Sequence, residues 1–246
     1  IERCIIDISP TVLINDLIAC MVTGISSGIL VLGSIPMFES IFKVITPFGL
    51  SELADHNQPL LKRLQFEAPG TFAHSLAMSN MAESVAEAID ADPILTRIGA
   101  LYHDIGKLKR PLFFIENQTY FGIENPHNKL NPRLSKMVIM AHPRDGIELA
   151  KEYNLPPQIQ DFITQHHGET LAAYFYNQAI KEEGIENVSK EQFRYSGPKP
   201  NSKETAIVMI TDAVESASRT LKEYTVEEIN KPILKTIARP KGTLKI

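Results

Sequence analysis

The chain has 246 residues, of which 43% are hydrophobic, and its formal net charge at pH 7 is -4. This length suffices for one sizeable domain with an appendage, and the acidic balance argues against a general nucleic-acid-binding protein. The two cysteines, Cys4 and Cys20, give no disulfide framework and therefore favour a reducing compartment. Because the chain begins at Ile1 without a methionine, we expect a piece of a longer protein.

The N-terminal segment contains a long run without charge. No charged residue occurs between positions 17 and 38, and an acidic residue stands on each side of this run. About 20 apolar residues are needed to cross a bilayer, and the spacing of Gly24 and Gly28 allows close helix packing. The run therefore predicts a transmembrane helix at about 17–38, with a buried helix of a soluble protein as the alternative. The acidic flanks argue against a signal peptide, and the apolar residues 1–15 are interpreted as the end of an earlier span.

Helix caps and apolar periodicity predict that the rest of the chain is helical, and no strand pattern occurs. Asp92 and Asn131 each precede a proline, which is typical of the first turn of a helix, and Gly106 is expected to end the helix that follows Asp92. The aromatic and asparagine-rich stretch 111–130 predicts a long loop beside a functional site. Short helical connectors are predicted at 39–65, followed by a Pro69-Gly70-Thr71 turn. The first predicted helices run over 72–90, from Pro93 to about Gly106, from Pro132 to His142, and, as a separate helix, from there to Tyr153. Later helices are predicted from Pro157 to His166-His167, over 169–183, from Ser202 onwards and from Thr225 onwards.

Five histidines fall at helix ends or on helical stretches, whereas His56 and His127 lie in loops and are interpreted as surface residues. A lone buried histidine is more often a hydrogen-bonded core residue than a ligand. Asp212 lies in an apolar helical run, and its buried carboxylate needs a partner. A metal ion would be such a partner, and an arginine or a chain of hydrogen bonds is the alternative. Taken together, imidazoles and carboxylates without cysteine suit a first-row metal such as iron, manganese or zinc. The candidate metal ligands are His74, His103, Asp104, His142, His166, His167 and Asp212.

A basic cluster directly follows the His-Asp pair and consists of Lys107, Lys109 and Arg110. The functional interpretation is that Lys107 binds a substrate phosphate. The alternative for all three residues is a favourable interaction with the C-terminus of the preceding helix.

The string His103-Asp104-Ile105-Gly106-Lys107, set among the other histidines and Asp212, resembles the HD superfamily of metal-dependent phosphohydrolases in its two-metal form. From about Gly24 to about Glu228 the chain is similar to the seven-transmembrane HD family of bacterial cyclic di-AMP phosphodiesterases. The stretches that carry this likeness are Glu67-Ala68-Pro69-Gly70-Thr71, Phe113 to Gln118, Asn125-Pro126-His127, His166-His167-Gly168, Phe193-Arg194-Tyr195 and Gly197-Pro198-Lys199-Pro200. The final stretch departs from the family pattern.

The resemblance implies an all-α fold, in which a transmembrane helix precedes an HD-domain helical bundle. Residues 1–50 would end the membrane region, and residues 51–246 would form a cytoplasmic HD phosphohydrolase domain at the bacterial inner membrane. The implied activity is metal-dependent hydrolysis of cyclic di-AMP to the linear dinucleotide in second-messenger signalling. The implied partners are cyclic di-AMP and the membrane rather than a nucleic-acid polymer, and a homodimer stays open.

The resemblance also implies two divalent or mixed-valence metal ions, iron or manganese. One ion would be held by His74, His103, Asp104 and Asp212, and Asp104 would bridge to a second ion held by His142, His166 and His167. A bridging hydroxide would attack phosphorus. Asp104 and Lys107 would be the catalytic residues, and Lys107 would also bind substrate.

Several alternatives stay open. A cyclic di-GMP phosphodiesterase would carry a GYP motif after the histidine pair, where Gly168-Glu169-Thr170-Leu171 stand instead. A guanosine-tetraphosphate hydrolase normally has acidic residues soon after its His-Asp pair, where Ile105 follows here. A non-catalytic nucleotide-binding HD signalling module would be expected to have lost ligands. A structural helical domain would not explain a buried Asp212 together with five imidazoles.

Aromatic residues of two stretches, 111–127 and 193–200, are candidates to stack on nucleobases, which typically contributes ~1–3 kcal/mol per base. These aromatic residues are Phe113, Phe114, Tyr120, Phe121, Phe193 and Tyr195. Packing in the core or within the loops is the alternative. A preference for adenine over guanine rests on the family resemblance alone.

Overall fold

The computed structural model describes residues 9–219. The chain divides into two compact units, Ile1–Val44 and Ile45–Ile246. The predicted boundary after residue 50 stays a prediction, although Leu50 is buried and belongs to the core of the second unit. The predicted helix from Thr225 lies outside the described residues.

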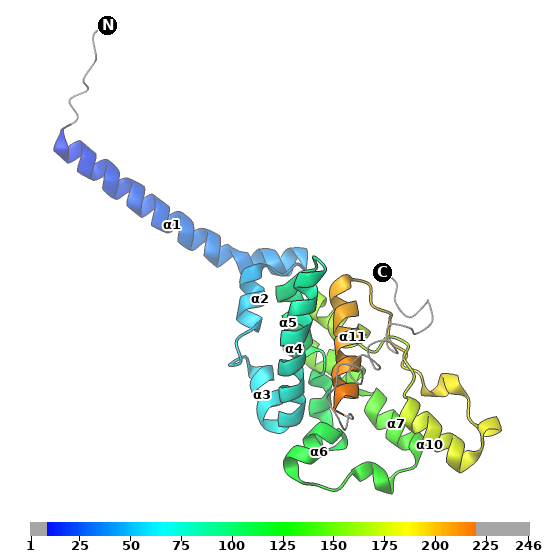
Figure 1. Cartoon of the computed structure of the whole chain (residues 1–246). Helices are drawn as coiled ribbons and strands as arrows, with labels where there is room; N and C mark the ends of the chain where they lie inside the picture. Colours follow the sequence, from blue (N-terminus) through cyan, green and yellow to red (C-terminus); the bar gives the residue numbers. More distant parts are fainter. Residues whose placement is uncertain (1–8, 220–246) are drawn as a thin grey trace. The chain divides into compact units, whose positions relative to one another are not determined.

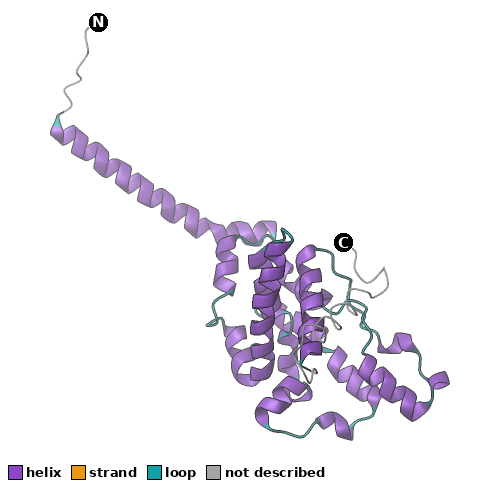
Figure 2. Cartoon of the chain, viewed as in Figure 1, coloured by secondary structure: helices purple, strands orange, loops and turns teal. Residues whose placement is uncertain are grey.

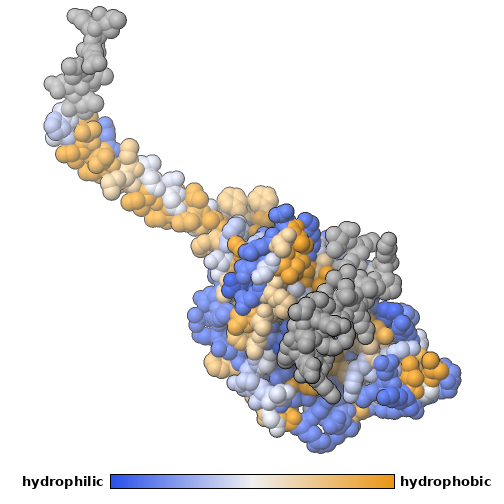
Figure 3. Space-filling view, in the orientation of Figure 1, coloured by the Kyte–Doolittle hydropathy of each residue, from blue (hydrophilic) through white to orange (hydrophobic). Residues whose placement is uncertain are grey.

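In the first unit, the described residues form one long helix, α1 (Pro10–Phe42), which has 33 residues and none of them buried. Its length and composition suffice to cross a membrane, and Figure 3 shows the apolar side chains along it. The helix starts at a proline in its first turn and ends where Lys43 adopts a left-handed backbone with φ 53°. Because residues 10–15 belong to this same helix, their interpretation as the end of an earlier span is wrong. Residues 1–8 of that predicted span lie outside the described residues.

The second unit is built from helices and short 3₁₀ turns (Figures 1 and 2). Its α-helices are α2 (Pro47–Leu53), α3 (Pro59–Glu67), α4 (Pro69–Ala88), α5 (Pro93–Tyr102), α6 (Ile115–Phe121), α7 (Pro132–Met140), α8 (His142–Glu152), α9 (Pro157–Gln165), α10 (Ala173–Glu183) and α11 (Lys203–Ser218). Its 3₁₀ turns are η1 (Ile105–Lys109), η2 (Pro111–Phe113), η3 (Pro126–Lys129), η4 (Ile185–Asn187) and η5 (Lys190–Phe193). Among the described residues the only extended pairing is one isolated bridge between Leu171 and Arg194. The predicted all-α fold with an N-terminal apolar helix is confirmed.

Several predicted helix starts are confirmed by their caps. The side chains of Asp92 and Asn131 accept hydrogen bonds from the backbone amides of Leu95 and Leu134, and a proline follows each cap. Ser202 caps α11 in a capping box. Such caps satisfy amides that have no partner inside the helix.

Other boundaries differ from the prediction. Helix α4 begins at Pro69 itself, whereas a turn was predicted at 69–71. The predicted helix over 169–183 begins only at Ala173, because the chain before it pairs with Arg194. Gly106 does not end α5, which already ends at Tyr102.

The stretch 111–130 is not the long loop that was predicted, because it contains the helix α6 and two 3₁₀ turns. Asn117 anchors α6 to the start of α4: its Oδ1 atom accepts from the Thr71 amide, and its Nδ2 atom donates to the Thr71 hydroxyl. Gly70 permits this contact, because a Cβ atom there would collide with the Glu116 carbonyl. His127, expected on the surface, is half-buried, and its ring bonds the Phe113 carbonyl at 3.0 Å. His56 is exposed as expected.

The core of the second unit lies between α3, α5, α8 and α9, where leucine and isoleucine side chains pack together. A second cluster joins α4, α5, α9 and α11 and includes Met78, Phe162 and Val208. Figure 1 shows α4, α5 and α11 side by side, and these helices contact one another. Burying each large apolar side chain contributes roughly 1.5–3 kcal/mol. The packing fixes the relative positions of the helices that carry the predicted ligands.

Candidate metal centre

All seven predicted metal ligands meet in one place. His74 comes from α4, Asp212 from α11, and the other five stand at helix ends: His103 and Asp104 follow α5, His142 begins α8, and His166 and His167 follow α9. The potential ligand atoms of His74, His103 and Asp104 lie within 4.8 Å of one another, and so do those of His142, His166 and His167.

Asp104 lies between these two groups, and each of its carboxylate oxygens faces a different one. Its Oδ2 atom is 3.1 Å from His103 Nε2 and 3.7 Å from His74 Nε2. Its Oδ1 atom is 3.4 Å from His142 Nε2 and 3.7 Å from His166 Nε2. This arrangement matches what a carboxylate that bridges two metal ions requires.

Backbone carbonyls orient three of the imidazoles. The Nδ1 atoms of His103, His142 and His166 donate to the carbonyls of Ala100, Ile139 and Phe162 at 2.7, 2.6 and 3.0 Å. Each of these carbonyls lies in the last turn of a helix, so a histidine just beyond that helix can reach it. With the proton on Nδ1, each Nε2 atom presents its lone pair towards Asp104, which is how metal-binding histidines are usually held.

His74 is oriented by a side chain instead. Its Nδ1 atom donates to Glu215 Oε2 at 2.7 Å, and its Nε2 atom lies 3.3 Å from Asp212 Oδ1. Glu215 also accepts a hydrogen bond from Arg219. Sequence reasoning missed Glu215, although its position three residues after Asp212 on one helix places both on the same face.

In the group around His74, buried charges lower the pKa of Asp104 and raise the pKa of His74. Burial works against the ionised form of Asp104, but His103 and Lys107 outweigh it and hold the carboxyl pKa well below its usual value. Burial also lowers the pKa of His74, but Asp212 and Glu215 overcome it and raise this pKa to about 9. Metal binding at His74 would therefore displace a proton.

In the second group, burial keeps the three imidazoles neutral. Burial lowers the pKa of His142 and, much further, that of His166. For His167, burial and the neighbouring His142 lower the pKa to about 3. Neutral imidazoles are the form that binds metal.

Lys107 lies against the candidate bridging carboxylate. Its Nζ atom is 2.7 Å from Asp104 Oδ2 and 2.8 Å from Glu116 Oε1. Burial disfavours the charged ammonium, but the two carboxylates outweigh it and raise the lysine pKa. Lys107 is therefore a fixed cation next to the site. Glu116 was not predicted as a site residue, because its stretch was interpreted as a loop.

The glycine of the His-Asp-Ile-Gly-Lys string has a packing reason. Gly106 lies against α8, where any Cβ atom would collide with the backbone carbonyl of His142 and approach the amide of Gly146. The missing side chain thus allows the segment that carries Asp104 to lie directly on the helix that begins with His142.

Two cavities open beside the ligands. One of about 310 Å³ is lined by His74, Lys107, Glu116 and Arg219 among others. Another of about 270 Å³ is lined by His166, His167, Tyr195 and Asp212 among others. Predicted ligands line each cavity, and Ser216 lines both.

The aromatic candidates for base stacking separate into four kinds. Phe114 and Phe193 are buried, which fits the core-packing alternative, whereas Tyr120 and Phe121 are largely exposed. Tyr195 lines the second cavity and stacks on His167 with ring centroids 4.2 Å apart. Phe113 packs edge-on against His127.

The residues present fit a pair of metal ions. Within the described residues 9–219, the buried His103 Nε2 and Asp104 Oδ1 atoms have no hydrogen-bond partner, although buried polar atoms are normally satisfied. Both atoms belong to the predicted ligand set, and imidazole nitrogens with carboxylate oxygens suit first-row metals.

Comparison with known proteins agrees with this geometry. A family model described as "HD domain" matches residues 71–217. The chain belongs to the HD domain family. The matched HD region contains all seven predicted ligands, from His74 to Asp212.

Two relatives are similar in sequence to most of this chain. "Cyclic-di-AMP phosphodiesterase PgpH" of Bacillus subtilis is 44% identical over 211 residues, which cover 86% of this chain and 29% of the relative. The protein of the same name from Listeria monocytogenes is 47% identical over 210 residues, covering 85% of this chain and 29% of the relative. The chain thus spans less than a third of the length of these relatives.

A solved structure is similar as well. The crystal structure of the L. monocytogenes phosphodiesterase PgpH HD domain in complex with cyclic-di-AMP has a TM-score of 0.70 and 44% sequence identity, and the match covers 75% of this chain and 84% of that chain.

Proposed function

We propose that this chain is the catalytic part of a metal-dependent phosphodiesterase that hydrolyses cyclic di-AMP to the linear dinucleotide. The observation that carries the proposal is Asp104, whose two oxygens each face a separate group of imidazoles while Lys107 lies against it. The likeness to an HD domain that binds cyclic di-AMP supports the choice of substrate.

The proposed cofactor is a pair of divalent or mixed-valence metal ions, iron or manganese. His74, His103 and Asp212 would hold one ion, His142, His166 and His167 would hold the other, and Asp104 would contact both. Bound ions would supply positive charge that polarises a phosphoryl oxygen and lowers the pKa of a water molecule.

The chain's own residues prepare the site for a phosphodiester. Lys107 stays protonated between Asp104 and Glu116, so it presents a cation to the negative charge that develops on phosphoryl oxygens. Backbone hydrogen bonds hold His103, His142 and His166 in one orientation before substrate arrives. Hydrolysis adds water across one P–O bond, which opens the cyclic dinucleotide to a linear one.

The proposal places the catalytic unit on the cytoplasmic side of the bacterial inner membrane, with α1 as the anchor. The proposed role of α1 as an anchor rests on the length and the exposed apolar surface of this helix. Removing residues 1–44 should yield protein that stays in solution without detergent, whereas the intact chain should fractionate with membranes. Intact chain that fractionates as soluble protein would refute the anchor.

Substrate choice is tested by product analysis. The intact chain, loaded with manganese or iron, is incubated separately with cyclic di-AMP and cyclic di-GMP, and products are separated by chromatography. The proposal predicts faster conversion of cyclic di-AMP to its linear dinucleotide. Faster cleavage of cyclic di-GMP, or cleavage of neither while a nucleoside triphosphate is hydrolysed, would refute the substrate and leave a broader phosphohydrolase.

A further inference from the structure

Glu116 is a largely buried carboxylate at the start of α6 that lies outside the predicted ligand set. Its Oε1 atom accepts two hydrogen bonds, from Lys107 Nζ at 2.8 Å and from the Thr71 hydroxyl at 3.1 Å. Hydrogen bonds from a cation to a carboxylate are among the strongest in proteins. Glu116 therefore fixes Lys107 from the side opposite to Asp104.

The hydrogen bonds continue from Glu116 into the core. Asn117 Nδ2 donates to the Thr71 hydroxyl at 2.9 Å, so the single hydroxyl proton of Thr71 is left for Glu116. The Thr71 amide donates to Asn117 Oδ1 at 3.0 Å, and both residues are fully buried. A buried polar network whose members are satisfied is rigid, so α4 and α6 together hold the Glu116 carboxylate in one place.

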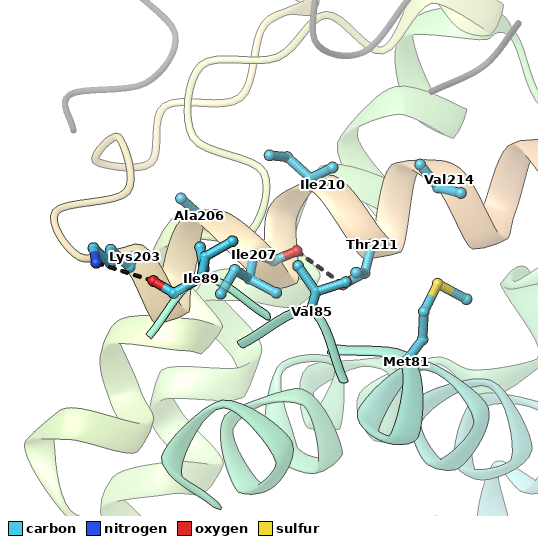
Figure 4. Close-up of a pocket in the computed structure, with 9 residues that line it drawn as sticks. All are labelled: Met81, Val85, Ile89, Lys203, Ala206, Ile207, Ile210, Thr211 and Val214. Carbon is cyan, nitrogen blue, oxygen red and sulfur yellow. Dashed lines mark hydrogen bonds between the residues drawn. The ribbon is translucent and has the colours of Figure 1, made fainter. Parts of the chain in front are cut away.

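The cavities near this network differ in what they offer a charged ligand. An apolar groove of about 370 Å³ between α4 and α11 contains none of the predicted metal ligands (Figure 4). Its charged residue, Lys203, donates to the Ile89 carbonyl at 3.2 Å. The cavity of about 310 Å³ instead has Lys107 and Glu116 in its wall beside the predicted ligand His74. Of these two cavities, the one with Lys107 suits a phosphodiester at the metal centre.

Lys107 also contacts an oxygen that faces the first group of imidazoles. Its Nζ atom lies 2.7 Å from Asp104 Oδ2, and this oxygen faces the Nε2 atoms of His103 and His74. The Lys107 ammonium and any cation held by these ligands would repel each other, because like charges interact strongly in a buried site. The 310 Å³ cavity gives the lysine side chain room to move away, so a second carboxylate is needed to keep it in place.

We propose that Glu116 is a positioning residue, which holds Lys107 beside the metal centre when cations occupy the predicted ligands. This inference deepens the proposed function and rests on it for the role of Lys107 in the reaction. Glu116 is not a further ligand or a group that contacts substrate. Its effect on the reaction passes through Lys107 alone.

A double-mutant cycle in the intact, manganese-loaded chain tests this dependence. Glu116→Gln should lower kcat for cyclic di-AMP by roughly tenfold or more, because a small misplacement of a catalytic group costs up to about 10²-fold. In a Lys107→Met background the same substitution should change kcat by less than about twofold, because two residues that act through one contact are not additive. The matched control is Glu124→Gln, at an exposed position.

Two results of the cycle would overturn the proposal. A loss of kcat by the same factor in both backgrounds would show that Glu116 acts without Lys107, for example by holding α6 on α4. An unchanged kcat in Glu116→Gln would show that Asp104 suffices to place the lysine. If Glu116→Gln alone does not fold, the comparison within the Lys107→Met background still decides, because the double variant removes both charges of the buried pair.

Lysine labelling gives a readout that needs no turnover, so it separates failure of this proposal from failure of the proposed function. Manganese-loaded chains are treated briefly with acetic anhydride, and peptide mass spectrometry compares Lys107 with the exposed Lys109. Glu116→Gln should raise the relative labelling rate of Lys107 roughly tenfold, which is typical of losing one hydrogen bond to a charged group. Equal Lys107 labelling in the two chains would overturn the proposal, whichever substrate the chain hydrolyses.

Discussion

The two groups of imidazoles on either side of Asp104 are built differently. The group with His74 and His103 has further carboxylates beside it, from Asp212 and Glu215. The group with His142, His166 and His167 has a carboxylate neighbour in Asp104 and a more distant one in Asp212, 3.9 Å from His167. One half is therefore rich in negative charge, and the other consists of neutral imidazoles.

This difference appears in the pKa values. His74 has a raised pKa, whereas His142 and His166 have lowered pKa values. Negative charge attracts a cation more strongly than neutral nitrogen does. We therefore expect the half with His74 to hold its metal ion more tightly than the other half.

The largest expected effect comes from removing the carboxylate that both halves share. Asp104→Asn should lower phosphodiesterase activity by about 10³-fold or more, because metal ions contribute several kcal/mol of transition-state stabilisation and each 1.4 kcal/mol is tenfold in rate. Steady-state rates with cyclic di-AMP measure this. The control is Asp90→Asn, at an exposed position whose φ of 53° an asparagine accepts. Equal activities would show that Asp104 does not bridge the halves.

A smaller effect should follow from damaging only one half. His166→Ala should remove one metal ion and leave the ion of the His74 half in place, whereas His74→Ala should spare the other half. Activity in both should fall by roughly 10²-fold or more, and elemental analysis separates the two cases. His56→Ala, at an exposed histidine, is the control. Loss of both ions in His166→Ala would mean that the halves do not bind independently.

Loss of the Lys107 side chain should reduce the turnover rate but leave the bound metal content unchanged. Lys107→Met should lower the turnover rate by about 10²-fold, which is typical when one stabilising donor is removed, while both ions remain bound. The matched control is Lys109→Met, since that lysine is exposed. Metal content that falls in parallel with turnover would show that Lys107 acts by holding Asp104 in place.

The smallest effect is expected at Glu215, which bonds to the predicted ligand His74 and is not itself one of the predicted ligands. Glu215→Gln keeps the side-chain shape but removes the charge that orients His74. Such outer contacts are typically worth 10–100-fold in metal affinity, so titration should show a loss of about that size in the His74 half alone. The control is Glu87→Gln on the exposed face of α4. An unchanged affinity would show that Asp212 suffices to orient His74.

The sequence was sufficient to predict which side chains meet around Asp104, because the five histidines and Asp212, taken together, form a set that suits a metal site. Their role as metal ligands stays a prediction. Helix caps such as Asp92 and Ser202 were equally clear, since a cap is a local interaction. The resemblance to the HD family then supplied the pairing of ligands with metals, which spacing alone did not.

What the sequence did not predict depends on contacts between distant segments. Helix α6 forms where a loop was expected, because Asn117 and Glu116 contact Thr71 of α4. The same contact lets α4 start at Pro69 rather than after a turn. Glu215 was overlooked because a glutamate near the end of a helix usually faces solvent, and only the neighbouring His74 gives it a role.

Metal stoichiometry tests the central claim most directly. The intact chain should be loaded with excess manganese or iron, freed of unbound metal and measured by elemental analysis against protein concentration. Two groups of ligands sharing Asp104 predict two ions per chain, and far less metal in Asp104→Asn. One ion per chain in the unaltered protein, or two ions retained by Asp104→Asn, would contradict the two-metal account.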